Sequence, residues 1–477
     1  MRLISLALCL LATTGLAGCA TPQLGPKRDI AAPSDFAAAR SFVGADAAWP
    51  SAGWWQAYGD PQLDTLIDEA LAGSPDIAIA AARLRAAQGA AQQAGAAGLP
   101  QLSADGSVGY NKQSYNNGIP AEFVPKGWND TGRVGLNASF DLDLWGRNRA
   151  SLAAATSDAE ATRLDGAQAA LLLATSVASA YADLARLFAE QDVLQRALEV
   201  RTATAKLVSD RVALGLDTQG EMKQARSAVP AARVDLAANA EQIGLARNRI
   251  AALIGAGPDR GLAIGRPKLP ALAADGLPAN AGIALIGRRP DIAAARARAE
   301  AAASRIKVAR VDFYPDLSLT GLIGMQALGL GNLVKGTSSM GNVGPALSLP
   351  IFDGGTLRGR YVQARGQYDE AVANYDSTLV GALREVADAV TSRRQLAVQT
   401  TDARASLVDA EGAFQIAQLR YRGGLSTFLD VLSAEQNVLT ARRSLADIDS
   451  RRFTLDVALV RALGGGFQPK LQISGTR

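Results

Sequence analysis

The chain has 477 residues, 48% of them hydrophobic but only 5% aromatic, and a formal net charge of +4. This composition favours packed helices, and its mixed charges without a basic stripe argue against nucleic-acid binding. Histidine is absent, which removes the common catalytic triads and the usual metal ligands, so we expect neither an enzyme nor a bound cofactor or metal.

The N-terminal residues have the form of a secretory signal peptide. Arg2 supplies a positive charge, residues 3–11 form a short apolar run, and the sequence L-A-G-C ends at Cys19. These four positions match a bacterial lipobox, which predicts removal of residues 1–18 and acylation of Cys19. The alternative is an ordinary signal peptide that is cut near Ala20. Ala20 in place of an aspartate favours, by the rule for lipoproteins, delivery to the outer membrane.

The next segment, residues 19–59, is rich in proline, alanine and glycine and is expected to form an extended, lipidated strap. Asp60 and Pro61 then mark the start of a helix, with the aspartate as its N-cap and the proline at its first position. Ser74 and Pro75 repeat this signal. The sequence therefore predicts that helical structure follows the strap.

Two segments then alternate regularly between apolar and polar residues, as a strand with one face in each environment does. They cover residues 101–110 and 133–144 and are separated by a polar, glycine-containing loop. Each is about ten residues long, the length of a tilted membrane-spanning strand. For any single strand, a small soluble sheet under the helices is the alternative. The pattern assigns Leu136, Phe140 and Leu142 to lipid and Asn137, Ser139 and Asp141 to the lumen.

A long proline-free helix follows each strand pair, reaches a glycine-containing turn and returns as a second helix. At the second turn, Gly423 and Gly424 are expected to supply the left-handed C-cap and Ser426 the N-cap of the returning helix. Arms of about 40 to 60 residues would be roughly 60–95 Å long. The four helices are expected over residues 149–212, 217–254, 357–421 and 426–463.

The strands and hairpins occur twice, with an offset of about 210 residues between the copies. The tripeptide Pro-Asp-Ile at 75–77 recurs at 290–292, and strand patterns recur at 317–325 and 343–351. The duplication predicts the following division: first structural repeat 60–255, connector 256–282, second structural repeat 283–463, and irregular C-terminal tail 464–477.

Four membrane strands cannot close a barrel by themselves, because two lipid-exposed edges would leave backbone groups unpaired. The chain is therefore expected to pair with copies of itself. Two to four copies would supply the roughly eight or more strands that a closed barrel needs.

Several short motifs, in their order along the chain, resemble the TolC-like outer-membrane efflux channels, in the lipoprotein branch that includes NodT and OprM. The resemblance spans about residues 54–463 and implies a mixed α and β membrane protein. It implies a homotrimer with a twelve-stranded outer-membrane β-barrel, continuous with a long periplasmic α-helical barrel. The motifs are W-W with G-D-P at 54–61, R-P-D-I at 289–292, F-Y-P-D-L-S-L-T-G at 313–321, P-I-F-D-G-G at 350–355, R-Y-R-G-G at 420–424 and F-L-D-V-L at 428–432.

The function that this resemblance implies is the outer-membrane channel of a tripartite efflux system. Such a channel is a passive exit duct, served by a periplasmic adaptor and an inner-membrane pump, here of the RND type. The alternatives are the channel of a type I protein secretion system and a periplasmic adaptor lipoprotein, which would have one hairpin and no duplicated strand pairs. Drugs, metal ions, siderophores and proteins all remain open as substrates.

The resemblance also assigns a periplasmic gate to the region of the two turns. Tyr421 matches a tyrosine that tethers the entrance shut, whereas Gly220 and Ser426 replace residues that take part in the tether elsewhere. Glu221 and Asp430 match carboxylates that constrict the entrance, where six of them in a trimer would attract cations. The alternative is that both acids are solvated first-turn residues that complement the helix N-terminus.

The two turns themselves are expected to contact the adaptor. A repeated Arg-x-x-x-Gly pattern leads into each of them. Without the resemblance, they would be interpreted as ordinary solvated turns. The residues assigned to docking are Gly215, Leu216, Gly423 and Gly424.

Overall fold

The computed structural model describes residues 22, 24–32, 35–37, 40–42, 47–268, 276–278 and 281–468, so the signal peptide and Cys19 lie outside the described part. The chain divides into two compact units. Unit 1 combines residues 1–30, 83–162 and 295–375, and unit 2 combines 31–82, 163–294 and 376–477.

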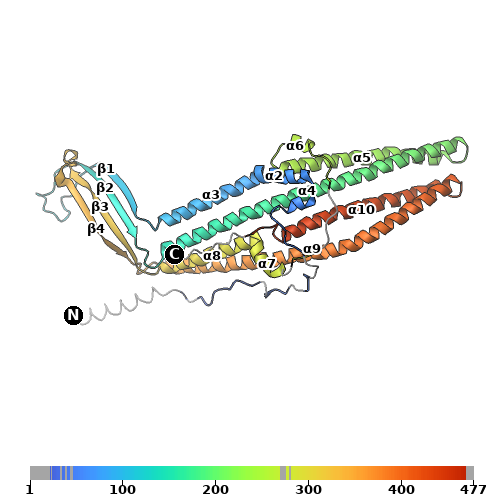
Figure 1. Ribbon diagram of the computed structural model, residues 1–477. Coiled ribbons are helices and arrows are strands. Elements are labelled where there is room, and N and C mark those ends of the chain that lie inside the picture. The colour runs from blue at the N-terminus through green and yellow to red at the C-terminus, as the bar shows by residue number, and fades with distance from the viewer. Residues whose placement is uncertain are drawn as a thin grey trace. The chain divides into compact units, whose positions relative to one another are not determined.

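The elements follow the predicted order of helix, strand pair and hairpin, twice over (Figure 1). In chain order they are η3 (Trp54–Tyr58), α2 (Pro61–Gly73), α3 (Pro75–Ala96), β1 (Gln101–Asn111), β2 (Asn129–Asp141), α4 (Arg147–Ala213), α5 (Gln219–Leu253), α6 (Pro258–Leu262), α7 (Ala281–Arg288), α8 (Pro290–Val311), β3 (Asp316–Leu328), η4 (Leu330–Asn332), η5 (Gly336–Ser338), β4 (Ser339–Ser348), α9 (Thr356–Arg422) and α10 (Phe428–Ala462).

Equivalent helices of the two copies have the same length, which confirms the internal duplication. Helices α4 and α9 have 67 residues each, and the returning helices α5 and α10 have 35 each. Helices α3 and α8 have 22 each. The connector predicted at residues 256–282 contains the short helix α6, which begins with a proline at its first position.

Unit 1 contains one antiparallel sheet with the strand order β1-β2-β3-β4 (Figure 1). Its register agrees with the predicted alternation. Leu136 lies opposite Ala104 and Ile323 on the apolar face, and its neighbour Asn137 faces the other side. The sheet therefore has one apolar and one mainly polar face, and β1 and β4 are its two edges.

Two strands end earlier than predicted, β2 at Asp141 and β4 at Ser348. The reason is turn chemistry after β2. Asp141 accepts a hydrogen bond from the backbone N–H of Asp143 at 2.9 Å, and Asp143 has a φ of 45°. The carboxylate of Asp143 then accepts the N–H of Asn148 at 2.9 Å. The alternating pattern continues through Leu142 and Leu144, but the regular strand ends at Asp141, and Leu142 makes a last backbone hydrogen bond to Leu317 of β3 at 3.2 Å.

The register makes a direct prediction for membrane insertion. Leu136→Arg places a charge on the lipid-facing side of β2 and should cost about 2–4 kcal/mol for each chain, whereas Asn137→Arg should cost far less. The yield of detergent-extracted oligomer measures the difference. Equal yields from the two variants would mean that the apolar face of the sheet does not contact lipid.

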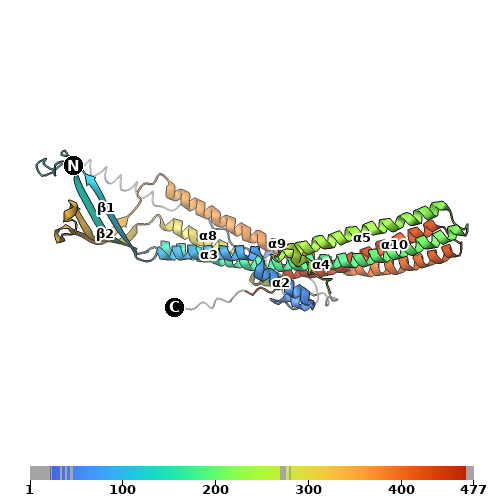
Figure 2. The same cartoon turned by 90° about the horizontal axis from the view of Figure 1, so that it is seen from above.

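Unit 2 contains the two hairpins, formed by α4 with α5 and by α9 with α10 (Figures 1 and 2). Its core gathers aromatic residues of η3 against α2 and the hairpin helices. Asp60 is the N-cap of α2 as predicted and accepts the Gln62 N–H at 3.0 Å. It also accepts the hydroxyl of the buried Tyr181 at 2.6 Å. The start of α2 is therefore bonded directly to α4.

The R-P-D-I motif holds the start of α8 in place within unit 2. Arg289 is only 5% exposed and donates to Asp291 at 2.6 Å and to Glu385 of α9 at 2.8 Å. It also donates to the carbonyl oxygen of Ala462, at the end of α10, at 2.9 Å. A buried guanidinium needs this complete set of acceptors. The motif therefore has a structural role.

Each returning helix ends at a left-handed glycine that packs against another backbone segment. Gly255 follows α5 with a φ of 75°, and Gly464 follows α10 with a φ of 88°. A Cβ atom at Gly464 would overlap the carbonyl oxygen of Arg288, and one at Gly255 would lie 2.6 Å from that of Gly73. The segment after Gly464, predicted to be irregular, thus begins with an ordered turn.

Candidate functional site

The two hairpin turns have the same backbone structure. Gly215 and Gly424 both have a φ of 72°, the left-handed conformation that ends many helices. The residue after each glycine donates its N–H to the carbonyl five residues earlier, at 2.9 Å in the first turn and 2.8 Å in the second. Of the predicted pair Gly423 and Gly424, only Gly424 adopts the left-handed conformation.

A capping box starts each returning helix. In the first hairpin, Thr218 accepts the Glu221 N–H at 3.2 Å, and Glu221 accepts the Thr218 N–H at 2.7 Å. In the second, Thr427 and Asp430 make the same pair of bonds at 3.4 and 2.9 Å. The prediction that Ser426 is the N-cap is therefore wrong. Thr427 takes the position because it has a carboxylate three residues later.

The two predicted gate carboxylates, Glu221 and Asp430, occupy equivalent places in these boxes. Each also accepts a hydrogen bond from its threonine hydroxyl at 2.9 Å. The backbone N–H and the hydroxyl of Thr427 lower the pKa of Asp430, so this group is ionised at neutral pH. Both acids thus complement a helix N-terminus, and Asp430 is exposed to solvent while doing so.

Tyr421, the third predicted gate residue, is buried and bonded to the other hairpin. Its side chain is 2% exposed, and its hydroxyl donates to the carboxylate of Asp217. Arg211 donates to both oxygens of the same carboxylate, at 2.9 and 3.2 Å. The guanidinium carbon of Arg211 lies 4.7 Å from the centre of the Tyr421 ring. These three side chains, here called the tip network, join the end of α9 to the turn between α4 and α5.

The protonation states of the tip network suit these bonds over a wide pH range. Burial raises the pKa of Tyr421, and its hydrogen bond to Asp217 raises it further. Burial alone would raise the pKa of Asp217, but the hydrogen bonds from Arg211 and Tyr421 outweigh it, and the pKa lies below its ordinary value. The tyrosine is therefore a neutral donor and the aspartate a charged acceptor at neutral pH.

Sequence reasoning identified Tyr421 but missed Asp217 and Arg211. The available signal was the comparison of the two copies. The position equivalent to Asp217 holds Ser426 in the second copy, and the position equivalent to Tyr421 holds Val212 in the first. The tip network uses one residue that is special to each copy, so each chain has one such network.

A second buried ion pair joins the hairpins further from the turns. Arg201 of α4 donates to Glu435 of α10 at 2.9 Å, and their side chains are 14% and 6% exposed. Burial raises the pKa of Glu435, and the ion pair with Arg201 opposes that rise. Ser450 of α10 also donates to the carbonyl oxygen of Ala182 in α4 at 3.3 Å. Contacts between the two hairpins therefore continue beyond the tip network, here between α4 and α10.

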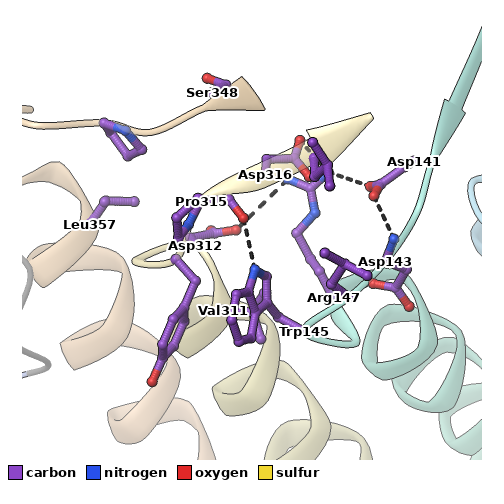
Figure 3. A pocket seen from close by; sticks show the side chains of 14 residues that line it. Asp141, Asp143, Trp145, Arg147, Val311, Asp312, Pro315, Asp316, Ser348 and Leu357 are labelled. Carbon is purple, nitrogen blue, oxygen red and sulfur yellow. Dashed lines mark hydrogen bonds and ion pairs between the residues drawn. The ribbon is translucent and has the colours of Figure 1, made fainter. Parts of the chain in front are cut away.

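At the ends of the strands, unit 1 has a cavity of about 210 Å³ lined by charged and aromatic side chains (Figure 3). Arg147 lies 3.3 Å from Asp141 and 4.0 Å from both Asp312 and Asp316. Trp145 donates its indole N–H to the carbonyl oxygen of Pro315 at 2.8 Å. Arg147 and Trp145 thus link the turn after β2 to the segment that leads into β3.

Next to this cavity, apolar side chains are exposed where the strands end. Tryptophan and other aromatic residues at such positions are typical of the boundary between membrane and water. Here the exposed apolar residues lie in the two segments that lead from β2 into α4 and from β4 into α9. We call them the apolar rim: Leu144, Trp145, Leu349, Ile351 and Phe352.

A sheet of four amphipathic strands combined with two long capped hairpins defines an outer-membrane channel subunit. Residues 66–256 and 284–465 match the family model described as outer membrane efflux protein. The chain belongs to this family, whose members are channel proteins. The predicted fold class, outer-membrane location and role as an efflux channel are thereby confirmed.

Individual relatives agree with this assignment. The chain is 39% identical to the fusaric acid resistance protein FusA of Burkholderia cepacia, over 74% of this chain and 68% of FusA. It is 33% identical to the multidrug resistance outer membrane protein MdtP of Shigella flexneri, over 98% of each chain. Among solved structures, it is similar to the outer membrane protein VceC of Vibrio cholerae, with a TM-score of 0.83 and 45% identity, over 88% of this chain and 100% of VceC.

Proposed function

We propose that the chain forms the outer-membrane duct of a tripartite efflux pump, as a homotrimer that contacts a periplasmic adaptor and an inner-membrane pump of the RND type. Three copies would place β1 of one sheet beside β4 of the next. That arrangement closes twelve strands without an open edge in the lipid. The duct is passive, and the inner-membrane pump supplies the energy.

The observation that carries this proposal is the tip network of Arg211, Asp217 and Tyr421. It joins the two hairpins of one chain through buried, charge-assisted hydrogen bonds. Such bonds hold a fixed geometry and are lost together when the hairpins separate. A duct that must stay shut until a pump engages it needs a closure of this kind.

The carboxylates of Glu221 and Asp430 supply the second part of the proposed gate. In a trimer, six of them would stand at the starts of the returning helices. Their charge would favour the passage of cations over anions at a narrow opening. Capping and gating are compatible roles for Asp430, because the hydrogen bonds from Thr427 lower its pKa and keep the carboxylate ionised.

The substrates that we propose are small organic molecules. The names of two relatives, FusA and MdtP, refer to resistance to fusaric acid and to multiple drugs. The type I secretion alternative would require passage of an unfolded protein. Export of a drug, with no secreted protein in the medium, would favour the efflux system.

We also propose that Cys19 carries a lipid. The support is the lipobox sequence that ends at this residue. Metabolic labelling with a palmitate analogue should mark the wild type and spare Cys19→Ser. Equal labelling of the two proteins would contradict the proposed lipid anchor at Cys19.

The hairpin turns are the proposed docking surface for the adaptor. Exposed leucines surround the turn glycines, and Leu216 and Leu425 are 61% and 72% exposed. Apolar side chains at an exposed turn suit contact with a partner. The turn residues Gly423 and Gly424 belong to the same surface as Gly215.

Replacing a turn glycine by a residue with a bulky side chain tests this docking surface and the proposed function together. Gly215→Trp should abolish drug export in a host that lacks its own channel while leaving oligomer yield intact. Gly215→Ala is the matched control, because it carries the same backbone strain without the bulk, and nothing lies within 4 Å of its Cβ position. Drug susceptibility measures export. Normal export by Gly215→Trp and Gly424→Trp would rule out docking at the turns.

A further inference from the structure

Part of the strap, residues 24–32, lies along one face of helix α9. Arg365 donates to the carbonyl oxygens of Pro26 at 3.0 Å and Gly25 at 3.4 Å. One turn later, the hydroxyl of Tyr368 donates to the carbonyl oxygen of Arg28 at 3.1 Å. The strap is therefore bound through its backbone, and these contacts set its register on the helix.

The side chain of Arg365 is buried where the strap contacts α9. It is 7% exposed and lies beside an apolar cluster that α8 and α9 form, with Tyr368 and Val372 among its members. A buried guanidinium needs hydrogen-bond acceptors. The acceptors that the structure gives Arg365 are the two strap carbonyls. Lifting the strap from α9 would leave this cation without them, so docking of the strap is coupled to the burial of Arg365.

The strap follows α9 from its beginning towards its middle. Gly25 and Pro26 lie at Arg365, and Arg28 lies at Tyr368. From Arg28 back to Gly25, the strap therefore runs in the direction of the first turn of α9, which begins just after the apolar rim.

The length of chain available agrees with this direction and leaves little slack. Cys19 precedes Gly25 by six residues, and such a segment reaches at most about 20 Å when fully extended. Arg365 lies nine residues after the first residue of α9, about 14 Å along the helix axis. A lipid on Cys19 can thus reach the start of α9 while the strap is docked, but only with most of the chain extended.

We propose that Arg365 and Tyr368 form a clamp that holds the strap on α9. The clamp fixes the length of chain between α9 and the lipid on Cys19, so that the acyl chains insert next to the apolar rim. The clamp binds the strap backbone, and the acyl chains on Cys19 bind the phospholipid surface beside the barrel. This inference rests on the proposed acylation of Cys19.

Shortening the strap tests the clamp. Deleting residues 21–24 leaves only Ala20 between Cys19 and Gly25, a reach of about 7 Å, which is less than the helix distance. In membranes, the strap must then leave the clamp or the lipid must leave the bilayer. We expect the strap to detach, because withdrawing acyl chains from a bilayer costs much more than two or three hydrogen bonds.

Trypsin can detect detachment, because Lys27 and Arg28 are in the docked segment and their exposed side chains are cleavage sites. Cleavage there separates the palmitate label on Cys19 from the body of the protein. We expect the label to leave the body roughly tenfold faster in the deletion variant than in the wild type. Insertion of four glycine and serine residues at the same place, the matched control, should leave the rate unchanged.

Two further variants separate the clamp from the anchor. Arg365→Met should speed the loss of label at normal strap length, whereas Arg358→Met, an exposed arginine on the same helix, should not. In a version secreted with an ordinary signal peptide and no lipid, the deletion should not speed strap cleavage, which mass spectrometry can follow.

The outcomes distinguish the two proposals. A wild type without label would overturn the lipid anchor and the clamp with it. A labelled deletion variant that is cut at the wild-type rate would overturn the clamp alone and leave the lipid anchor standing. Faster cleavage of the unlipidated deletion variant would also overturn the clamp, because the lipid would then not be the cause of detachment.

Discussion

Breaking the tip network should open the periplasmic end of the channel and raise its single-channel conductance in planar bilayers. Arg211→Met leaves the carboxylate of Asp217, whose side chain is 6% exposed, with the Tyr421 hydroxyl as its remaining partner in the network. Removing one partner of such a pair costs about 2–4 kcal/mol of the closed state. A loss of that size shifts the balance between closed and open forms roughly 30- to 1,000-fold.

Tyr421→Phe should raise the conductance less, because it removes one hydrogen bond worth about 1–3 kcal/mol and keeps the ion pair. The matched control is Arg420→Met, which removes the same charge at the equivalent, exposed position of the second copy. The assignment of the tip network fails if Arg211→Met and Arg420→Met have the same conductance.

Asp430→Asn should lower cation selectivity while leaving conductance near the wild-type value.

The pKa shifts predict when the tip network is intact in the wild type. The pKa of Asp217 is lowered, so its contribution is present above the ordinary value of 3.8 and is lost as the pH falls through the lowered pKa. The pKa of Tyr421 is raised, so its contribution is present below 10 and is lost as the pH rises through the raised pKa. Conductance should therefore stay low between about pH 5 and pH 9.

A methyl group at Gly464 should destabilise the assembled protein more than one at either hairpin turn. Gly464→Ala forces alanine into a left-handed conformation and pushes its Cβ atom into the carbonyl oxygen of Arg288. Backbone strain and overpacking together should cost about 3–5 kcal/mol. The backbone at Arg288 has little freedom to move away from the added methyl group, because the neighbouring Arg289 is hydrogen-bonded to α9 and α10.

The matched control for this prediction is Gly424→Ala. Its backbone is also left-handed, with a φ of 72°, but nothing lies within 4 Å of the added Cβ atom. It should therefore lose only the strain, about 1–2 kcal/mol. The temperature at which the oligomer dissociates on a gel compares the two variants. Similar temperatures would show that the segment around Arg288 adjusts to the extra methyl group.

The sequence predicted the fold well because both copies carry local signals. Period-two alternation marked the four strands, and glycine turns marked the hairpin ends. The errors were also local, and they arose where two signals competed. Ser426 and Thr427 are both suitable N-caps, and the carboxylate of Asp430 decides between them. The alternation after Asp141 continued past the point where aspartate side chains turn the backbone.

The partners of Tyr421 could not be predicted in the same way. Asp217 and Tyr421 lie in different hairpins, and no local pattern relates residues so far apart in sequence. Only the packing of one hairpin on the other brings them together, against the apolar cluster that includes Val208, Phe428 and Val431. The contact between the strap and Arg365 escaped prediction for the same reason.

The length of the capped hairpin helices has a mechanical consequence. Helix α10 has 35 residues, so it is a rod of about 50 Å. Its base is held by the turn at Gly464, and its far end is closed by its own capping box. A tilt of about 5° at the base would carry the far end roughly 4–5 Å, further than the length of any bond in the tip network. A small rotation of the hairpin about its base, without unwinding a single helical turn, is therefore enough to separate the side chains of the tip network.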